Sequence, residues 1–259
     1  MMSITACIKH AAGKNTLVRR WHIIRTGRRL FRAHPEWKRF ADDWYRSRLD
    51  GRSSLVDQRP WLTYPTLQWL AETDWSGKRV FEWGGGGSTL FFLRAGAVVV
   101  TVEHDRQWGD QIEAAANAHG YESLDLRLHE PIATTNGSGC QPYTSTNARY
   151  QKLSFEPYVK TIDEFPDNSF DLILVDGRSR CACLNHAISK VADGGVILFD
   201  NAEREAYQDA IEHTSTRRLT NWKQIDLSGP TPYLWDAQAS TLAWCRISGI
   251  DAERFNDAK

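Results

Sequence analysis

Apolar and polar positions along the chain change period several times, and each change predicts a new element. Between residues 79 and 199, short apolar runs alternate with stretches in which apolar residues recur every three to four positions. The short runs are typical of buried parallel strands, and the longer period is typical of helices. The predicted strands are Arg79–Trp83, Ala97–Val102, Leu124–Leu128, Phe170–Val175 and Val196–Phe199.

Helical stretches separate these strands and carry their own start and stop signals. Thr63-Tyr64-Pro65 has the form of a helix start, and Asp105 can cap the helix that Gly120 can end. Strands joined by single helices predict a parallel sheet with helices on both faces. The other predicted helices are Ser88–Arg94, Phe155–Phe165, Cys181–Val191 and Glu203–His213.

The last two predicted strands break this alternation. Trp222–Leu227 and Thr241–Ile247 are joined through Gly229-Pro230-Thr231-Pro232, with little room for a crossover helix. We therefore expect an antiparallel hairpin at the sheet edge. The predicted fold class is an α/β sheet of seven strands, mostly parallel, with an antiparallel C-terminal hairpin.

The first forty residues differ from the rest of the chain in charge. Residues 1–40 hold ten Lys and Arg side chains and one acid, Glu36, so their net charge of +9 is balanced by −9 elsewhere. This asymmetry does not resemble that of a uniformly basic nucleic-acid binder, so no nucleic-acid partner is expected. We predict a basic helical extension over 1–60 and a main domain over 61–259.

Apolar residues recur at helical spacing among the N-terminal arginines. Leu17, Trp21, Ile24 and Phe31 form this series, which predicts a basic amphipathic helix. Such a helix could bind an anionic membrane surface or an anionic substrate. We expect it instead to dock on the acidic body of the same chain or of its mate in a homodimer.

Composition places the chain among ordinary globular proteins. Of its 259 residues 41% are hydrophobic and 25% are charged, and no apolar run approaches the length of a membrane span. The five cysteines are odd in number and include no C-x-x-C pair, which argues against a disulfide framework or a four-thiolate zinc site. We therefore expect free thiols and a reducing, cytoplasmic location.

The most informative stretch is Glu82-Trp83-Gly84-Gly85-Gly86-Gly87-Ser88-Thr89, between a predicted strand and a predicted helix. Glycines let a backbone turn sharply and approach a ligand closely, and a helix N-terminus offers free N–H groups. A second acid, Glu103, ends the next strand 21 residues after Glu82. At that spacing an acid meets ribose hydroxyls in nucleotide-binding α/β folds, so the pattern favours such a ligand over a purely structural turn.

The residues around the glycines narrow the class of nucleotide. A dinucleotide fingerprint has a glycine where Thr89 stands, and Glu82 would place a carboxylate beside a pyrophosphate. No Lys-Ser or Lys-Thr pair follows the glycines, which argues against a nucleoside-triphosphate loop. A carboxylate suits a ligand with an ammonium group, such as S-adenosylmethionine (SAM), which also carries a ribose.

These motifs resemble those of class I SAM-dependent methyltransferases, whose sheet is Rossmann-like. The resemblance rests on the E-x-G-x-G-x-S pattern and Val-Glu-His-Asp within Val80–Asp105, and spans about residues 61–250. It is greatest to a bacterial group with a Val-Asp-Gly-Arg stretch. It implies a SAM site made of Gly84, Gly85 and Gly86 along the methionine moiety, Glu82 near the ammonium through a water or backbone amide, Ser88 in the same motif, Glu103 on the ribose and His104 near the adenosine.

Further polar residues follow the fourth and fifth predicted strands, where ligands bind in such sheets. Asp176, Asp200 and Asn201 are similar to the metal-binding set of catechol O-methyltransferase-like enzymes, which implies an optional Mg²⁺. Arg178 departs from that pattern, and its guanidinium could pair with Asp176 or with an anionic substrate. The alternative is that Asp200 and Asn201 cap the helix that starts near Glu203.

Together these features predict a methyltransferase that acts on a small-molecule or sugar acceptor, at oxygen. Asp176 and Asp200 are the catalytic candidates, with Asp176 as the base or a metal ligand. The rival interpretations are an NAD-dependent oxidoreductase and a non-catalytic SAM- or nucleotide-binding module with a membrane-surface helix. The long polar stretch from Pro131 to Ser154 is either a lid or a disordered insertion.

Overall fold

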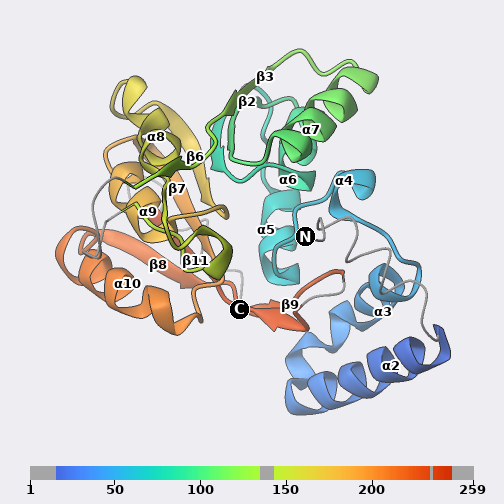
Figure 1. The fold of residues 1–259 in the computed structure, drawn as a ribbon. Helices are drawn as coiled ribbons and strands as arrows, with labels where there is room; N and C mark the ends of the chain where they lie inside the picture. Colours follow the sequence, from blue (N-terminus) through green and yellow to red (C-terminus); the bar gives the residue numbers. More distant parts are fainter. Residues whose placement is uncertain (1–15, 135–142, 234–235, 247–259) are drawn as a thin grey trace.

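A computed structural model describes residues 16–134, 143–233 and 236–246. Its centre is a sheet of seven strands in the order β3-β2-β1-β6-β7-β11-β8 (Figure 1). Neighbouring strands from β3 to β7 run parallel, and β11 pairs antiparallel with both β7 and β8. The predicted fold class is therefore confirmed. The strands are β1 (Arg79–Trp83), β2 (Val98–Glu103), β3 (Leu124–Leu128), β6 (Phe170–Val175), β7 (Val191–Asp200), β8 (Trp222–Asp226) and β11 (Thr241–Arg246).

The C-terminal strand pair differs in one respect from the predicted hairpin. β8 is the edge strand, and β11 inserts between β7 and β8. The connection is not a tight turn, because it carries a second small antiparallel sheet of β9 (Gly229–Pro230) and β10 (Gln238–Ala239). This small sheet extends towards the N-terminal helices, and Trp44 Nε1 donates to the Ala237 carbonyl at 3.1 Å.

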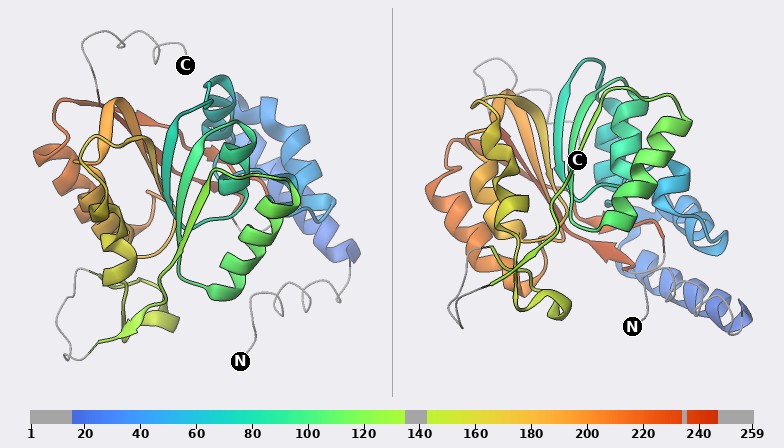
Figure 2. Two further views of the ribbon diagram at one scale, coloured as in Figure 1. Left: turned by 90° about the horizontal axis from the view of Figure 1, so that it is seen from above. Right: turned by 45° about the horizontal axis from the view of Figure 1, so that its top comes forward.

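Helices cover both faces of the sheet (Figure 2). The helices α5 (Tyr64–Glu72), α6 (Gly87–Arg94) and α7 (Arg106–Ala118) cover one face, where the N-terminal helices α2 (Thr16–Ala33), α3 (Ala41–Leu49) and α4 (Ser54–Asp57) join them. The opposite face carries α8 (Glu156–Lys160), α9 (Arg180–Ala187) and α10 (Glu205–Arg217). Short 3₁₀ turns lie at Pro35–Phe40, Ala148–Tyr150 and Thr161–Glu164.

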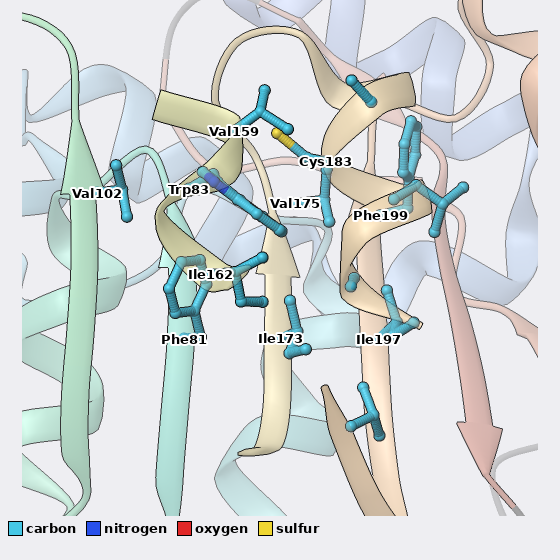
Figure 3. Close-up of a cluster of buried hydrophobic side chains, with 14 of the residues drawn as sticks. Phe81, Trp83, Val102, Val159, Ile162, Ile173, Val175, Cys183, Ile197 and Phe199 are labelled. Carbon is cyan, nitrogen blue, oxygen red and sulfur yellow. The ribbon is translucent and has the colours of Figure 1, made fainter. Parts of the chain in front are cut away.

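Alternate side chains of each strand enter two separate cores. In β1, Phe81 and Trp83 are fully buried against α8 and α9 (Figure 3), whereas Val80 is buried on the opposite face. Successive side chains of a strand point to opposite faces of the sheet, and here both faces are buried. The strands therefore appear in the sequence as continuous apolar runs. The two cores hold the sheet rigid and leave its carboxyl edge for polar residues.

Several predicted helix boundaries hold, and others shift. Thr63 caps α5 and Asp105 caps α7, each accepting a backbone N–H three residues ahead. The predicted helix over Phe155–Phe165 is instead α8 followed by a 3₁₀ turn. The helix predicted over Cys181–Val191 ends at Ala187, because the residues from Val191 onward pair with β6.

The N-terminal helix forms as predicted, but a different face meets the core. Ile23, Leu30 and Phe31 are buried, whereas Leu17 and Trp21 are 75% and 59% exposed. Gly27 explains which face of α2 packs against the rest of the protein. A Cβ at this position would lie 2.4 Å from the Tyr45 hydroxyl oxygen and 2.7 Å from the Trp44 ring. The close approach of α2 to α3 therefore selects the face that contains Gly27.

The described part of the segment after β3 contains short elements. β4 (Ile132–Ala133) pairs antiparallel with β5 (Leu153–Ser154), and residues 135–142 between them lie outside the described part. Cys183 and Cys245 are buried free thiols and Cys181 is half-buried, whereas Cys7 and Cys140 lie outside the described residues. Within the described ranges, no helix is long and apolar enough to cross a membrane.

Candidate active site

The glycine run lies at the carboxyl edge of the sheet, between the loops that follow β2 and β6. Gly84 has φ of +89°, and a Cβ there would lie 2.8 Å from the Gly177 Cα. A Cβ on Gly177 would in turn lie 1.8 Å from the Tyr158 hydroxyl oxygen. Only glycines allow the loops after β1 and β6 to meet this closely, so the two sequence motifs become neighbours.

The remaining glycines of the run differ in what surrounds them. A Cβ on Gly85 would lie 2.4 Å from Thr101, and one on Gly87 would lie 2.2 Å from the Arg59 carbonyl oxygen. A Cβ on Gly86 would meet only Trp108, at the ordinary contact distance of 3.4 Å. Among the four glycines, therefore, Gly86 is the one that packing within the protein does not require.

Glu82 lies behind this loop, with its side chain fully buried. Its carboxylate accepts hydrogen bonds from the hydroxyls of Ser88 at 2.6 Å, Thr101 at 2.7 Å and Thr89. Burial raises the pKa of Glu82 to about 7, although the three hydroxyl donors act in the opposite direction. The carboxylate thus joins β1, β2 and the first turn of α6.

The roles expected of Glu82 and Ser88 from the resemblance stay predictions, and in this structure the two side chains bind each other. Glu82 was expected near the ammonium group of SAM, but its carboxylate is held by three hydroxyls of the protein itself. Ser88 was expected among the cofactor contacts, yet its hydroxyl hydrogen points to Glu82. Thr89 also accepts the Gly86 N–H at 2.9 Å. A glycine at position 89, as in dinucleotide folds, would remove both of these contacts.

Glu103 ends β2 and faces the glycine loop, as the spacing predicted. Its side chain is nearly buried, and one carboxylate oxygen accepts the backbone N–H groups of His104 at 2.7 Å and Asp105 at 2.9 Å. The other oxygen accepts the Gly85 N–H at 3.2 Å. The carboxylate is therefore oriented towards the glycine run by bonds on both sides.

His104 links this edge to Tyr150 and to Arg178 of the Val-Asp-Gly-Arg stretch. Its Nε2 lies 3.2 Å from the Tyr150 hydroxyl and accepts from Arg178 Nε at 3.4 Å. Because a guanidinium nitrogen can only donate, Nε2 is the acceptor in the contact with Arg178. The other ring nitrogen, Nδ1, lies 2.7 Å from a Glu103 carboxylate oxygen, outside hydrogen-bond geometry. The Arg178 guanidinium also lies over the Tyr150 ring, 5.4 Å from its centroid.

Asp176 and Asp200 come together at the ends of β6 and β7, and a guanidinium lies between them. That guanidinium belongs to Arg180 and not to Arg178, which corrects the pairing suggested by the sequence. Arg180 Nη2 donates to Asp176 Oδ1 at 2.9 Å, and Arg180 Nη1 lies 3.6 Å from Asp200 Oδ2. Burial and the neighbouring Asp200 carboxyl raise the pKa of Asp176 well above its ordinary value, although Arg180 opposes them.

The residues predicted to hold Mg²⁺ do not fit a metal site in this arrangement. Asp200 Oδ1 accepts from the Thr241 hydroxyl at 3.0 Å, and Asn201 Oδ1 accepts from Arg204. Magnesium requires a near-octahedral set of oxygen ligands, whereas these oxygens already have cationic or hydroxyl donors. Within the described residues, no three His, Cys, Asp or Glu side chains form a metal-binding group.

The alternative role of helix capping is also wrong. α10 begins at Glu205, its N-cap residue is Arg204, and no side chain caps it by a hydrogen bond. Asn201 instead has φ of +54°, in the left-handed region that asparagine tolerates. The chain therefore turns sharply straight after β7.

Sequence reasoning missed the residues that connect the motifs. Arg180 stands four residues after Asp176, at the spacing of a helical ion pair, and this signal was available. Thr101 gave no signal, because a threonine inside an apolar strand is common. Tyr150 reaches His104 from a segment whose pattern predicts no regular element, so its position depends on the tertiary fold.

Comparisons with known proteins agree with this fold. No family model matches the chain, and no curated protein matches it. Among solved structures, the chain is similar to the O-methyltransferase TomG from Streptomyces achromogenes, involved in tomaymycin synthesis and solved in complex with SAM. The identity is 14%, the match covers 76% of this chain and 91% of that chain, and the TM-score is 0.53.

A second solved structure, the cofactor-bound Rv0187 from MTB, is 19% identical. The match covers 80% of this chain and 97% of that chain, with a TM-score of 0.51. At these identities the likeness concerns the fold. The chain has the Rossmann-like fold of class I SAM-dependent methyltransferases, as the resemblance of its motifs implied.

Proposed function

We propose that this protein is a SAM-dependent methyltransferase that transfers a methyl group to an oxygen of a small-molecule or sugar acceptor. The observation that carries the proposal is the junction of the glycine loop with Glu103. There a nearly buried carboxylate at the end of β2 is bonded to the Gly85 N–H at the carboxyl edge of the sheet. In open α/β sheets this edge is where ligands bind.

The cofactor assignments follow from this junction. Glu103 is assigned to the ribose hydroxyls, since a carboxylate accepts two hydroxyl donors well. Gly84, Gly85 and Gly86 are assigned to the methionine moiety and His104 to the adenosine wall. Glu82 and Ser88 are assigned to holding the loop that presents these groups. When bound, SAM supplies a methyl group that its sulfonium has already activated.

The acceptor side is assigned to Asp176. Its side chain is 25% exposed, whereas that of Asp200 is 5% exposed, so Asp176 is the carboxylate that an acceptor hydroxyl can reach. A raised pKa makes this carboxylate a stronger base for the hydroxyl proton. Asp200 is held by Thr241 and Arg180, and it helps to position Arg180 beside Asp176. Orientation of the hydroxyl behind the methyl carbon supplies most of the acceleration.

The NAD-dependent alternative is not favoured. A buried carboxylate at Glu82 and a hydroxyl-bonded Thr89 stand where a dinucleotide site has a pyrophosphate turn and a glycine. The strand beside β7 is also the antiparallel β11, whereas the dinucleotide fold continues with parallel strands.

Transfer of labelled methyl groups tests the proposal. The protein is incubated with methyl-labelled SAM and a panel of small hydroxylated acceptors, including sugars, and the label in each product is measured. We expect transfer that Asp176→Asn reduces by about 10²-fold or more, as loss of a general base does. SAM binding without transfer to any acceptor would favour the non-catalytic binding module instead.

We further propose that α2 contacts an anionic surface outside the protein. Leu17, Val18 and Trp21 are more than half exposed, and Arg25 lies over the Trp21 ring at 5.3 Å. Within the described ranges, no α2 arginine forms an ion pair with an acidic side chain of the same chain, and docking on the mate in a homodimer stays a prediction. Exposed apolar groups beside arginines suit the headgroup region of an anionic bilayer.

A further inference from the structure

Three charged side chains lie together at the ends of β6 and β7. Two carboxylates, Asp176 and Asp200, lie on either side of one guanidinium, that of Arg180, whose side chain is 7% exposed. Arg180 is the first residue of α9, and it follows the left-handed residue Ser179. This turn directs the Arg180 side chain back towards the backbone of Asp176 and Gly177.

Four hydrogen bonds hold the Arg180 guanidinium at this site. Nε donates to the Gly177 carbonyl at 3.1 Å, and Nη2 donates to both the carbonyl and the Oδ1 of Asp176 at 2.9 Å. Nη1 donates to the Asp200 carbonyl and lies 3.6 Å from its carboxylate, at ion-pair distance. A planar guanidinium offers five donors in a fixed fork, and four of them form hydrogen bonds at the ends of β6 and β7.

We propose that Arg180 is the fixed cation of this site and takes the position that a divalent metal would otherwise occupy between Asp176 and Asp200. The carboxylates of half-buried Asp176 and buried Asp200 repel each other, and the Arg180 guanidinium between them supplies the compensating positive charge. The guanidinium also donates to Oδ1 of Asp176, so this oxygen already has a cationic partner.

The consequence for the reaction is that the acceptor is positioned without a divalent ion. Arg180 acts as a positioning residue, because it holds the Asp176 carboxylate and does not reach the solvent-facing side itself. This inference rests on the proposed function only in taking this edge as the acceptor side. The claim about the cation concerns the protein without any substrate.

Titration of Mn²⁺ tests the proposal. Mn²⁺ prefers the same oxygen ligands as Mg²⁺, and its binding can be followed by electron paramagnetic resonance and by thermal unfolding. We expect the wild-type protein to show no Mn²⁺ site that depends on Asp176. A wild-type site that binds one Mn²⁺ and disappears in Asp176→Asn would overturn the proposal.

Two variants of the arginine sharpen the test. Arg180→Met has a similar length but no charge, so it leaves the two carboxylates without a cation and should bind Mn²⁺ at least about tenfold more tightly than wild type. Arg180→Lys keeps a cation and should remain without the Mn²⁺ site. A merely structural arginine would give no such difference between the two variants.

Each outcome decides the inference. A folded Arg180→Met protein that gains no Mn²⁺ affinity would contradict it, as would equal Mn²⁺ binding by the Met and Lys variants. If Arg180→Met does not fold, the wild-type and Asp176→Asn titrations still decide. Titration of the wild type with SAM reports separately on the proposed function, so failure of one is distinguishable from failure of the other.

Discussion

Replacement of Glu82 by glutamine is the perturbation whose outcome the structure specifies most fully. The carboxyl group is fully buried and accepts hydrogen bonds from Ser88, Thr89 and Thr101. Burial raises its pKa from an ordinary 4.5 to about 7. Glutamine keeps the shape and a carbonyl acceptor but cannot ionise. The variant therefore isolates the effect of charge from the effect of packing.

The direction of the pH effect follows from where the proton is held. Between about pH 4.5 and 7 the native protein retains a proton on Glu82 that the unfolded chain has released. Glu82 therefore lowers the free energy of unfolding as the pH rises through this window. A difference of about 2.5 pKa units corresponds to about 3 kcal/mol in total.

Urea unfolding at a series of pH values from 4 to 8 measures this effect. The free energy of unfolding of Glu82→Gln, relative to wild type, should rise by about 3 kcal/mol between pH 4.5 and 7. Glu113→Gln, an exposed position on α7, is the control and should show no such change. A difference between Glu82→Gln and wild type that stays constant with pH would refute the reasoning.

Two further predictions follow from the glycine run and from α2. Gly84→Ala should destabilise the protein by about 1–3 kcal/mol, because residue 84 has a left-handed backbone and lies against Gly177. Gly86→Ala should leave the unfolding temperature nearly unchanged and weaken SAM binding. Calorimetry measures both the unfolding temperature and the affinity for SAM. Equal stability losses for the two variants would contradict the packing argument. In sedimentation with phosphatidylglycerol vesicles, Trp21→Ala should reduce binding severalfold, whereas Val56→Ala, a control on α4 that is more exposed than Trp21, should not. Absence of vesicle binding by the wild type, or a concentration-dependent dimer in its place, would count against the proposed surface.

Much of the fold is predictable because its central strands are buried on both faces. The runs Arg79–Trp83 and Phe170–Val175 coincide with the buried strands β1 and β6, and the run Leu124–Leu128 coincides with the more exposed edge strand β3. Strand lengths of this kind depend on local apolar content and on the glycines and polar residues that flank them. The connection between β8 and β11 was not predictable in the same way, since β9 and β10 are stabilised by contacts with distant helices.

The location of the candidate site could be predicted from the sequence, but the hydrogen bonds between its side chains could not. The glycine run and Glu103 meet because parallel strands bring their carboxyl ends to one edge. Arg178 was a possible partner of Asp176, but Arg180 is the arginine that binds it, since sequence proximity does not show which way a side chain turns at a left-handed residue such as Ser179. The buried face of α2 depends on Gly27, whose significance appears only once α3 is packed against it.

Calorimetric titration of the purified protein with SAM, S-adenosylhomocysteine and NAD tests the central claim most directly. The account predicts that SAM and S-adenosylhomocysteine bind, that NAD gives no signal, and that Glu103→Ala removes the binding of both. A clear NAD signal without SAM binding would contradict the account and support the oxidoreductase interpretation. Unchanged SAM affinity in Glu103→Ala would contradict the assignment of the site.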